Sequence, residues 1–433
     1  MRGRICAGVL CLLSGMASAA DYRADPDDYR EQLRRLQAGD RLLLKSGDYR
    51  QGLPLHELSG RSGQPIIIEA LNPSAPLPRF IARPGANTVS LINVRYLVLR
   101  YLELDGRNVP VDAIKAEGHS RFADFITLEH LFIHDHAASQ QNVGISTKCP
   151  ALGWVVRNNR IERVGTGMYL GDSDGSDPFV AGVIEGNHVS DTLGYNLQIK
   201  HQNSRPADML ESGIRHDTLI RHNFFSKENA LPGANARPNV LVGHFPLTGV
   251  GSQDRYLIYS NLFWQNPSEA LFQGEGNIAL YNNVLINWSG SAVHVQPHND
   301  VPRQVDIFQN TVVARDEGIV LRNPEAGQSY PQRVVANLIF AARPLSSPGW
   351  AGNLSGHYDT AARHLRKPYA SLEELDLAPR HALVATLGIP SGYPDADLDF
   401  TNMTRASSEI GACQSGLPQR DCGAGVLKRW STP

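Results

Sequence analysis

The chain has 433 residues, with 41 basic against 43 acidic side chains and 42% hydrophobic residues. A formal net charge of -2 gives no general positive field, so the composition argues against a protein that attracts nucleic acid through its overall charge. No stretch after the first twenty residues approaches about eighteen consecutive apolar residues, and we therefore expect no membrane-spanning helix.

Residues 1–20 have the layout of a secretory signal peptide. Two arginines precede an apolar run over residues 5–13, and the small residues 17–19 form a cleavage site. We expect the mature protein to begin near residue 20 and to be periplasmic or secreted. In such a compartment Cys413 and Cys422 could close a small disulfide loop, which would leave Cys149 unpaired.

Residues 21–40 are expected to form an N-terminal capping helix. Asp25 and Pro26 suit the N-cap and the first helical position, while Tyr29 and Leu33 share one face and Gly39 follows as a stop. A short amphipathic helix here would cover the open end of a stack of strands, where bare edges invite aggregation.

A repeat with an apolar-x-x-Asn-x-apolar core occupies residues 41–342, and its segments alternate with a period of two. Key positions recur every 22 to 38 residues, at Tyr101, His130, Asn159, Asn187, Asn223, Asn261, Asn283, Asn310 and Asn337. Short β-branched runs cut by Gly and Asn at this period predict a right-handed parallel β-helix, an all-β solenoid, rather than a helical repeat. Residues 343–433 lose the period, and we interpret them as a C-terminal extension or cap.

The recurring asparagines are interpreted as scaffold. An inward Asn at one turn of each coil can hydrogen-bond the backbone of neighbouring coils, satisfying groups that a bend would leave unpaired. Because each repeat contacts only its neighbours, a chain of this length needs no division into several domains. We expect a monomer.

The second strand of each coil aligns into columns, and the residues that face outward form one groove because parallel strands stack about 4.8 Å apart. The first outward column is Lys115, Ser146, Tyr169, Gln198, Leu241, Phe272, His294 and Val320. The second is Glu117, Lys148, Gly171, Lys200, Gly243, Gly274, Gln296 and Arg322. In this alignment Gln273 takes an inward position, and His201, His244 and Glu275 follow at the turn.

Three features of these columns predict a saccharide-binding groove. Glycines at 171, 243 and 274 surround Lys200 and leave space for a ligand. Basic and imidazole groups gather there although the whole protein is slightly acidic, and aromatic rings offer surfaces on which a sugar could stack. The candidate catalytic residues are Lys200, His244, His201 and Arg322. The candidate substrate-binding residues are Tyr169, Gln198, Phe272, Gln273, Glu275, His294, Gln296 and His298.

Two long polar loops flank the coils of Lys200 and His244. Long loops on a rigid scaffold are where binding residues usually lie. The segment GDSDGSDP spaces three aspartates, Asp172, Asp174 and Asp177, around a glycine. It could ligate calcium through oxygen, but it lacks the distal bidentate Glu of a full calcium loop, and we favour a plain turn.

The repeat and the opening segment LQAGDRLLLKSGDYRQG resemble right-handed parallel β-helix proteins, many of which are lyases, hydrolases or epimerases that act on uronic acid polymers. Within that group, NLQIKHQN is similar to the strand of alginate lyases and chondroitinase-like lyases that carries the catalytic base, with Lys200 at the lysine position. Their next coil brings an arginine and a histidine, whereas this chain has Gly243 and His244. Their calcium-binding glutamates correspond to Leu193 and Tyr195.

These features favour eliminative cleavage of an anionic polysaccharide. Proton abstraction alpha to a uronate carboxylate needs a base, a proton donor and neutralisation of the carboxylate. Lys200 would be the base, His244 or His201 the acid, and Arg322 or His294 the neutralising group. Epimerisation, glycoside hydrolysis by two carboxyl groups, and saccharide binding without turnover remain as alternatives.

Overall fold

The computed structural model describes residues 19–203, 205, 209, 215–229, 231, 233–322, 330–346, 350–405, 408–416, 418 and 422–423. The expected signal peptide lies almost wholly outside these residues. Among the described helices, none has the length and apolar character needed to cross a membrane.

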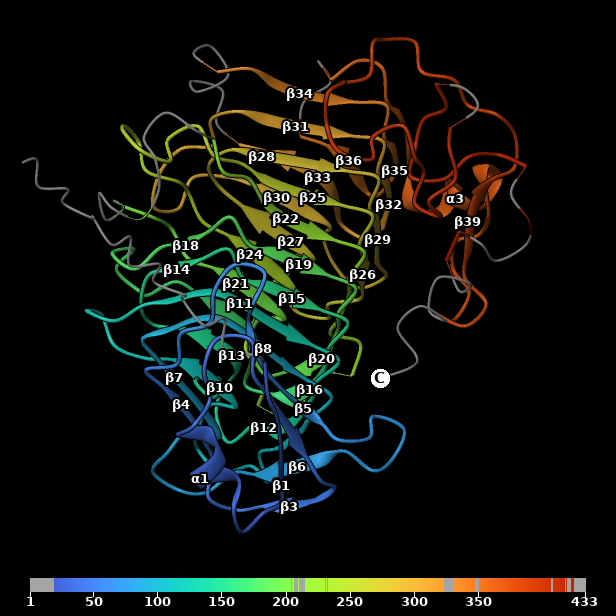
Figure 1. The fold of residues 1–433 in the computed structure, drawn as a ribbon. Coiled ribbons are helices and arrows are strands. Elements are labelled where there is room, and N and C mark those ends of the chain that lie inside the picture. The colour runs from blue at the N-terminus through green and yellow to red at the C-terminus, as the bar shows by residue number, and fades with distance from the viewer. Residues whose placement is uncertain are drawn as a thin grey trace, which may run out of the picture.

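Successive coils of the chain stack into three long parallel sheets, each coil placing one strand in each sheet (Figure 1). The first sheet contains β1 (Asp21–Ala24), β2 (Arg41–Leu44), β5 (Ile66–Ala70), β8 (Val94–Arg100), β11 (Ala123–Glu129), β15 (Val155–Arg157), β19 (Val183–Glu185), β22 (Thr218–Arg221), β25 (Tyr256–Tyr259), β28 (Ile278–Tyr281), β31 (Val305–Phe308) and β34 (Gln332–Val335). In addition, β14 (Ala151–Leu152) pairs with β11, and β18 (Phe179–Val180) pairs with β14.

The second sheet contains β3 (Gly47–Tyr49), β6 (Pro78–Ile81), β9 (Glu103–Asp105), β12 (Phe132–His136), β16 (Arg160–Val164), β20 (His188–Thr192), β23 (Phe224–Ser226), β26 (Leu262–Trp264), β29 (Val284–Asn287), β32 (Thr311–Ala314), β35 (Leu338–Phe340) and β37 (Leu354–Gly356). The third sheet contains β4 (Leu53–His56), β7 (Val89–Ile92), β10 (Ile114–Ala116), β13 (Val143–Thr147), β17 (Thr166–Leu170), β21 (Leu197–Ile199), β24 (Val240–Val242), β27 (Phe272–Gly274), β30 (Val293–Val295), β33 (Glu317–Leu321) and β36 (Arg343–Leu345). This arrangement confirms the predicted all-β parallel β-helix.

The core runs through the middle of the stack as a continuous column of apolar side chains. Alternate residues of each strand point inward, and in the third sheet Ile145, Leu197 and Val240 are fully buried. Each Å² of apolar surface that these rows remove from water stabilises the fold by about 25 cal/mol, and this burial drives the stacking of coils.

A ladder of asparagines lines the bend between the first and second sheets, as the repeat predicted. In each step the Asn Nδ2 and backbone N–H donate to the Oδ1 of the next Asn at 2.9–3.0 Å. The members are Asn159, Asn187, Asn223, Asn261, Asn283, Asn310, Asn337 and Asn353. The residue before each of these up to Asn337 has a positive φ, so the side chains satisfy backbone groups that the left-handed bend exposes.

The first two repeat positions were aligned one residue too early. His130 lies opposite Asn158, since Glu129 pairs with Arg157 and Phe132 with Arg160. Leu131 therefore takes the inward place and donates its N–H to the Asn159 Oδ1 at 2.9 Å. Tyr101 and His130 instead stack on each other outside the coil, with ring centroids 4.9 Å apart.

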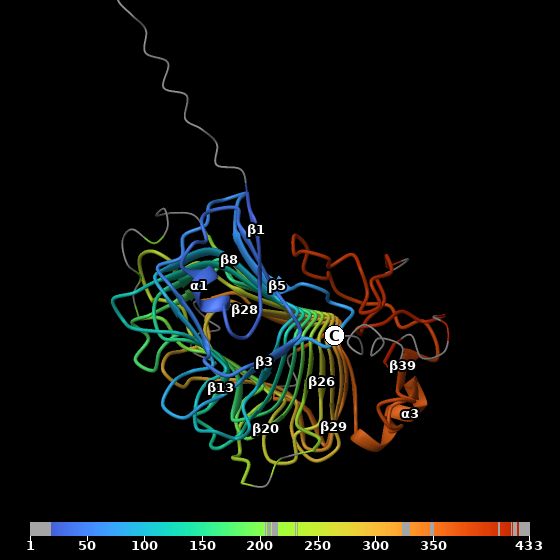
Figure 2. The same ribbon diagram turned by 60° about the horizontal axis from the view of Figure 1, so that its bottom comes forward.

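The N-terminal helix is much shorter than predicted. Residues 21–24 form β1, an edge strand paired with β2, and only α1 (Tyr29–Leu33) is helical. Asp28, rather than Asp25, occupies the N-cap position. Tyr29 and Leu33 are buried, and Tyr29 packs edge-on against Tyr49 and Phe80 in the first coils. α1 lies at the N-terminal end of the stack (Figure 2).

The stack continues beyond residue 342, where the sequence loses its period. β36 pairs with β33 and β37 with β35, which adds one more partial coil. After it come η1 (Tyr358–Thr360), α3 (Ala361–His364) and an antiparallel pair, β38 (Leu365–Lys367) with β39 (Asp376–Pro379).

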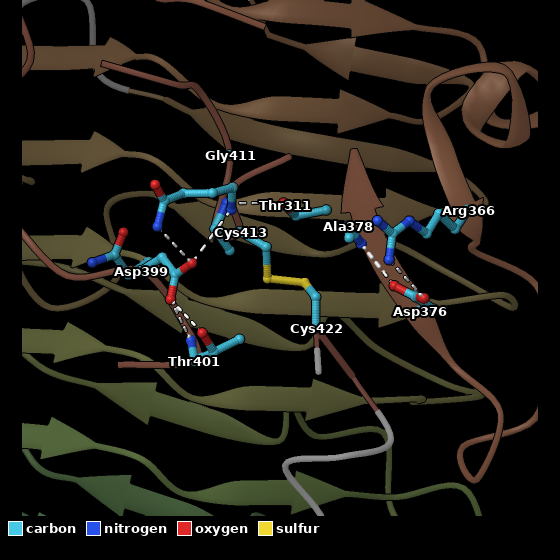
Figure 3. The surroundings of a disulfide bond; sticks show 12 residues. Thr311, Arg366, Asp376, Ala378, Asp399, Thr401, Gly411, Cys413 and Cys422 are labelled. Atoms are coloured by element: carbon cyan, nitrogen blue, oxygen red, sulfur yellow. Dashed lines mark hydrogen bonds and ion pairs between the residues drawn. A yellow bond between two sulfur atoms is a disulfide. The ribbon is translucent and has the colours of Figure 1, made fainter. Parts of the chain in front are cut away.

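The C-terminal extension lies along the flank of the later coils rather than across their end (Figure 1). Tyr281 donates its hydroxyl to the Pro394 carbonyl at 2.8 Å, and the Arg405 guanidinium donates to the Asn282 Oδ1 at 2.7 Å. The predicted disulfide between Cys413 and Cys422 is present (Figure 3). Cys149 is buried and unpaired. These contacts lie on the side of the asparagine ladder, so the described part of the extension does not cover the third sheet.

Replacing Asn223 by Ala should lower the free energy of unfolding by about 3 kcal/mol, because the side chain accepts two ladder hydrogen bonds and donates two inside the protein. Denaturant titration measures the change. Asn72→Ala, at an exposed loop position, is the control and should change stability by less than about 0.5 kcal/mol. Equal stability of the two variants would contradict the role of the ladder.

Candidate active site

The outward face of the third sheet carries the candidate site, but the register differs from the predicted one at one coil. Phe272, not Leu271, pairs with Val240 and Val293, so its ring faces the core and is fully buried. Phe272 therefore offers no surface to a sugar. Gln273 and Glu275 move to the outward columns, and Gly274 faces inward. The aromatic pattern alone could not reveal this shift, since Leu271 and Phe272 fit an inward position equally well.

Lys200 stands at the end of β21 and is half-buried. Its backbone N–H donates to the Leu170 carbonyl at 2.8 Å, which fixes it in the outward column beside Gly171. Burial lowers the pKa of its ammonium, while the charges of Glu275 and Asp172 act in the opposite direction. No carboxylate of the described residues lies within ion-pairing distance of this amine.

The correction brings Glu275 into the column of Lys200, with Gly243 on the coil between them. A Cβ on Gly243 would lie 2.4 Å from the His201 amide nitrogen, so this glycine is required by the close approach of two coils. The Glu275 Oε2 accepts the backbone N–H groups of His298, Asn299 and Asp300 at 2.8–3.2 Å. Glu275 thus holds the turn that carries His298.

His201 and His244 lie together at the turn after the strands. Their ring centroids are 5.3 Å apart, and both residues are more than nine-tenths covered. His201 packs against the loop at Gly175, and burial together with the charge of Lys200 lowers its pKa. The Nδ1 of His244 is 2.8 Å from the Phe245 carbonyl. The structure thus places His201, which directly follows Lys200, against His244 of the next coil, but both side chains are covered.

Lys148 was not singled out by the sequence, although it stands in the column of Lys200. Two strand spacings, about 10 Å, separate the two positions, with Gly171 between them. The Lys148 amine lies 3.5 Å from the centroid of the Tyr169 ring, and burial lowers its pKa to about 8. The Tyr169 hydroxyl is 3.0 Å from the Ser173 Oγ, and burial raises its pKa. Gln198, by contrast, is almost completely covered.

A pocket of about 170 Å³ opens on the coils after Lys200. Leu241 and Gln273 form its floor, and Glu275, Gln296 and His298 line the side where the strands end. The opposite wall comes from Tyr195, Arg237 and Glu269, with the Arg237 guanidinium 5.8 Å from the centroid of the Tyr195 ring. Sequence periodicity did not find these wall residues because they lie in loops outside the strand register.

Two predicted basic residues are not brought to Lys200. Arg322 is four strand spacings away, about 19 Å along the sheet. Glu317 pairs with His294 at 3.0 Å and with Arg322 at 3.7 Å, and Arg322 also donates to the Gln296 Oε1 at 3.2 Å. The positive charge of this end of the groove is therefore largely compensated by Glu317.

The aspartate segment forms a turn next to the groove. The Asp172 carboxylate accepts the Asp177 N–H at 3.0 Å and the Ser176 hydroxyl at 3.2 Å, and the Asp177 carboxylate contacts the His119 imidazole. These three side chains bring one nitrogen and two carboxylate donors within 4.8 Å of one another. Calcium prefers six to eight oxygens, so this donor set fits a transition metal better than the predicted calcium.

The buried Lys227 holds the wall loop of the pocket. Its amine donates to the Arg237 carbonyl at 3.0 Å, the Asn266 Nδ2 donates to the same oxygen at 2.9 Å, and burial lowers the lysine pKa to about 8. Asn235 reaches across to Gln140, donating to its Oε1 at 2.6 Å. The loop is thus fastened at both of its sides.

Lys227→Met should loosen this wall while leaving the stack folded, since the lost hydrogen bond serves the loop. We expect faster amide hydrogen exchange in residues 233–238 and little change in the rest of the third sheet. Lys45→Met, at an exposed lysine paired with Asp25, is the matched control. Unchanged exchange in the loop would show that Lys227 does not hold it.

No known family model matches this sequence, and no curated protein matches it. Among solved structures, the family 6 alginate lyase AlyGC is similar to 78% of the chain at 14% identity, with a TM-score of 0.50. The match covers 53% of that lyase, so the chain spans about half of its length. The pectate lyase Pel9A is similar over 93% of this chain and 98% of its own, at 14% identity and a TM-score of 0.50.

The lacto-N-biosidase of Eubacterium ramulus, a glycoside hydrolase of family 136, matches 78% of the chain at 14% identity and a TM-score of 0.45. At identities this low, the similarity to the two lyases shows a shared parallel β-helix fold.

Proposed function

We propose that this protein is exported and cleaves an anionic, uronate-containing polysaccharide by β-elimination, with Lys200 as the base. The observation that carries the proposal is the amine of Lys200, half-buried in the third-sheet groove, with a lowered pKa and no carboxylate partner in the described structure. A lysine in this state holds less tightly to its proton than one in water, as a base working near neutral pH requires.

The elimination needs three groups around one sugar unit. The base removes the proton alpha to the carboxylate, the electron pair forms a carbon–carbon double bond, and the glycosidic carbon–oxygen bond breaks as the leaving oxygen gains a proton. Lys200 takes the first proton. We assign the second proton to Tyr169, because its raised pKa keeps the hydroxyl protonated and it stands one coil from Lys200. Because the rings of His201 and His244 are covered, we assign them a structural role: they hold the turn that follows Lys200 in place.

Neutralisation of the substrate carboxylate is assigned to cations near Lys200. Lys148 stands in the same column, and the exposed Arg237 lines the adjoining pocket. Arg322 and His294, which Glu317 engages, would contact sugar units farther along the chain. A divalent ion bound by His119, Asp172 and Asp177 would add positive charge at the rim of the groove.

Lys200→Ala and Lys200→Arg should each lower the rate of cleavage at least about 100-fold, because a general base contributes on that scale and a guanidinium stays protonated. The assay follows the absorbance of unsaturated uronate products with alginate, polygalacturonate and glycosaminoglycan as substrates. Lys45→Ala is the control and should keep full activity. A flat trace on all polymers with wild-type protein would remove the lyase proposal.

Hydrolysis is the second candidate, and one observation favours it. Glu269 and Glu275 line opposite sides of one pocket, and a pair of carboxyl groups is what glycoside hydrolysis uses. Glu275, however, already accepts three backbone N–H groups. New reducing ends without unsaturated products would select hydrolysis, and binding of a polymer without either product would select a saccharide-binding protein.

The charge of Glu275 raises the pKa of Lys200 and so opposes the effect of burial. In Glu275→Gln the amide oxygen can still accept from the 298–300 turn while the charge is gone. A base is active when deprotonated, so the rising limb of the pH–rate profile should move to lower pH. Glu374→Gln, at an exposed glutamate of the C-terminal extension, should leave the profile unchanged. A shift to higher pH would contradict the assignment of Lys200.

A further inference from the structure

A second concave site lies on the same sheet, at the N-terminal end of the stack. This pocket has a volume of about 370 Å³ and is formed by α1, the turn before β4, the turn before β7, and the outward faces of both strands. Its polar lining consists of Arg30, Gln51, His56, Arg83, Asn87, Ser90 and Glu117. Nothing in the groove around Lys200 uses these groups.

Two arginines give this pocket its charge. Neither Arg30 nor Arg83 has an acidic partner within ion-pairing distance among the described residues, and the one hydrogen bond of Arg30 is a long one of 3.5 Å to the Gln51 Oε1. Burial raises the pKa of the Tyr29 phenol, and the positive charges of Arg30 and Arg83 act in the opposite direction. The Tyr29 hydroxyl donates to the Gly52 carbonyl at the base of the pocket. Gly52 has a positive φ, and a Cβ there would lie 3.2 Å from the Thr88 carbonyl oxygen, so this glycine lets the two turns approach closely at the base of the pocket.

The remaining polar groups suit a sugar. The His56 Nε2 lies 2.9 Å from the Ser90 Oγ, and the Asn87 amide donates to Glu117 at 3.0 Å. The Glu117 carboxylate is the negative group of the lining, and one of its oxygens accepts this hydrogen bond from Asn87. Hydroxyl, imidazole and amide groups beside two free guanidiniums match the hydroxyls and carboxylate of an acidic sugar.

The position of the pocket relates it to Lys200. β7 and β21 belong to the same sheet and are separated by β10, β13 and β17, which is four spacings or about 19 Å. Lys148, directly after β13, and Lys115, whose amine lies 3.6 Å from the Asp112 carboxylate, stand on the coils between them. A chain of acidic sugars that lies along the sheet would therefore meet cations from one pocket to the other.

We propose that the pocket of Arg30 and Arg83 is a remote binding site for the acidic polysaccharide, which holds a distant part of the chain whose other part lies at Lys200. The proposal rests on the anionic polysaccharide assigned above as ligand, but not on its cleavage. It implies that long chains bind more tightly than short ones, because two sites on one polymer act together.

Binding is measured on the Lys200→Ala protein, so that no substrate is consumed, with sodium alginate and sodium polygalacturonate as polymer probes and their trisaccharides as short probes. Replacing Arg30 and Arg83 together by Gln should weaken polymer binding about tenfold, because charge-assisted hydrogen bonds are lost. Binding of the trisaccharides, which cannot reach both sites, should not change by more than about twofold. Arg23→Gln, an exposed arginine of the first sheet, is the control.

Equal polymer affinity of the double variant and the control would overturn the remote site, and would leave the lyase proposal standing if wild-type protein still forms unsaturated products. Arginine-dependent polymer binding without any cleavage by wild-type protein would overturn the lyase proposal alone. If wild-type protein and the Lys200→Ala protein bind neither polymer, both proposals fail. Thermal unfolding of the double variant verifies that α1 remains packed on Tyr49 and Phe80.

Discussion

The register between successive coils is the constraint on which the rest of this structure depends. Hydrogen bonds between adjacent asparagine side chains set it at one bend, since each side chain both accepts from the coil before and donates to the coil after. A coil that slipped by one residue would break this ladder and also turn its apolar row outward. The lost hydrogen bonds and the exposed apolar row both disfavour a slipped coil, so the strands of the third sheet pair in a single register.

That alignment turns residues distant in sequence into neighbours in one groove. Lys148, Lys200 and Glu275 are separated by long stretches of chain, yet they occupy one outward column at intervals of two coils. The glycines between them permit coils to approach closely, as Gly243 does against His201. Neighbouring charges of the column are about 10 Å apart, and burial lowers the pKa of both lysines.

The described part of the C-terminal extension packs on the flank of the stack and leaves this groove accessible. Its apolar residues, such as Ile410 and Phe400, pack on the outer aromatic row that includes Tyr281 and Phe308. Left exposed, this aromatic row would form an apolar patch that favours aggregation, and the extension buries it. The groove on the third sheet is lined instead by loops that Lys227 and Glu275 hold in place.

The sequence by itself determined the fold, because the period of two within strands, the recurring asparagines and the spacing of coils all express the same local chemistry. It also determined that Lys200 faces outward among glycines and that Cys413 can reach Cys422. Only the tertiary structure decided which of two adjacent apolar residues, Leu271 or Phe272, fills the core, because both satisfy the pattern and the choice depends on pairing with neighbouring coils. It likewise decided that Glu317 engages Arg322 and His294, and that Tyr195, Arg237 and Glu269 form a wall, because contacts between loops and between remote coils leave no period in the chain.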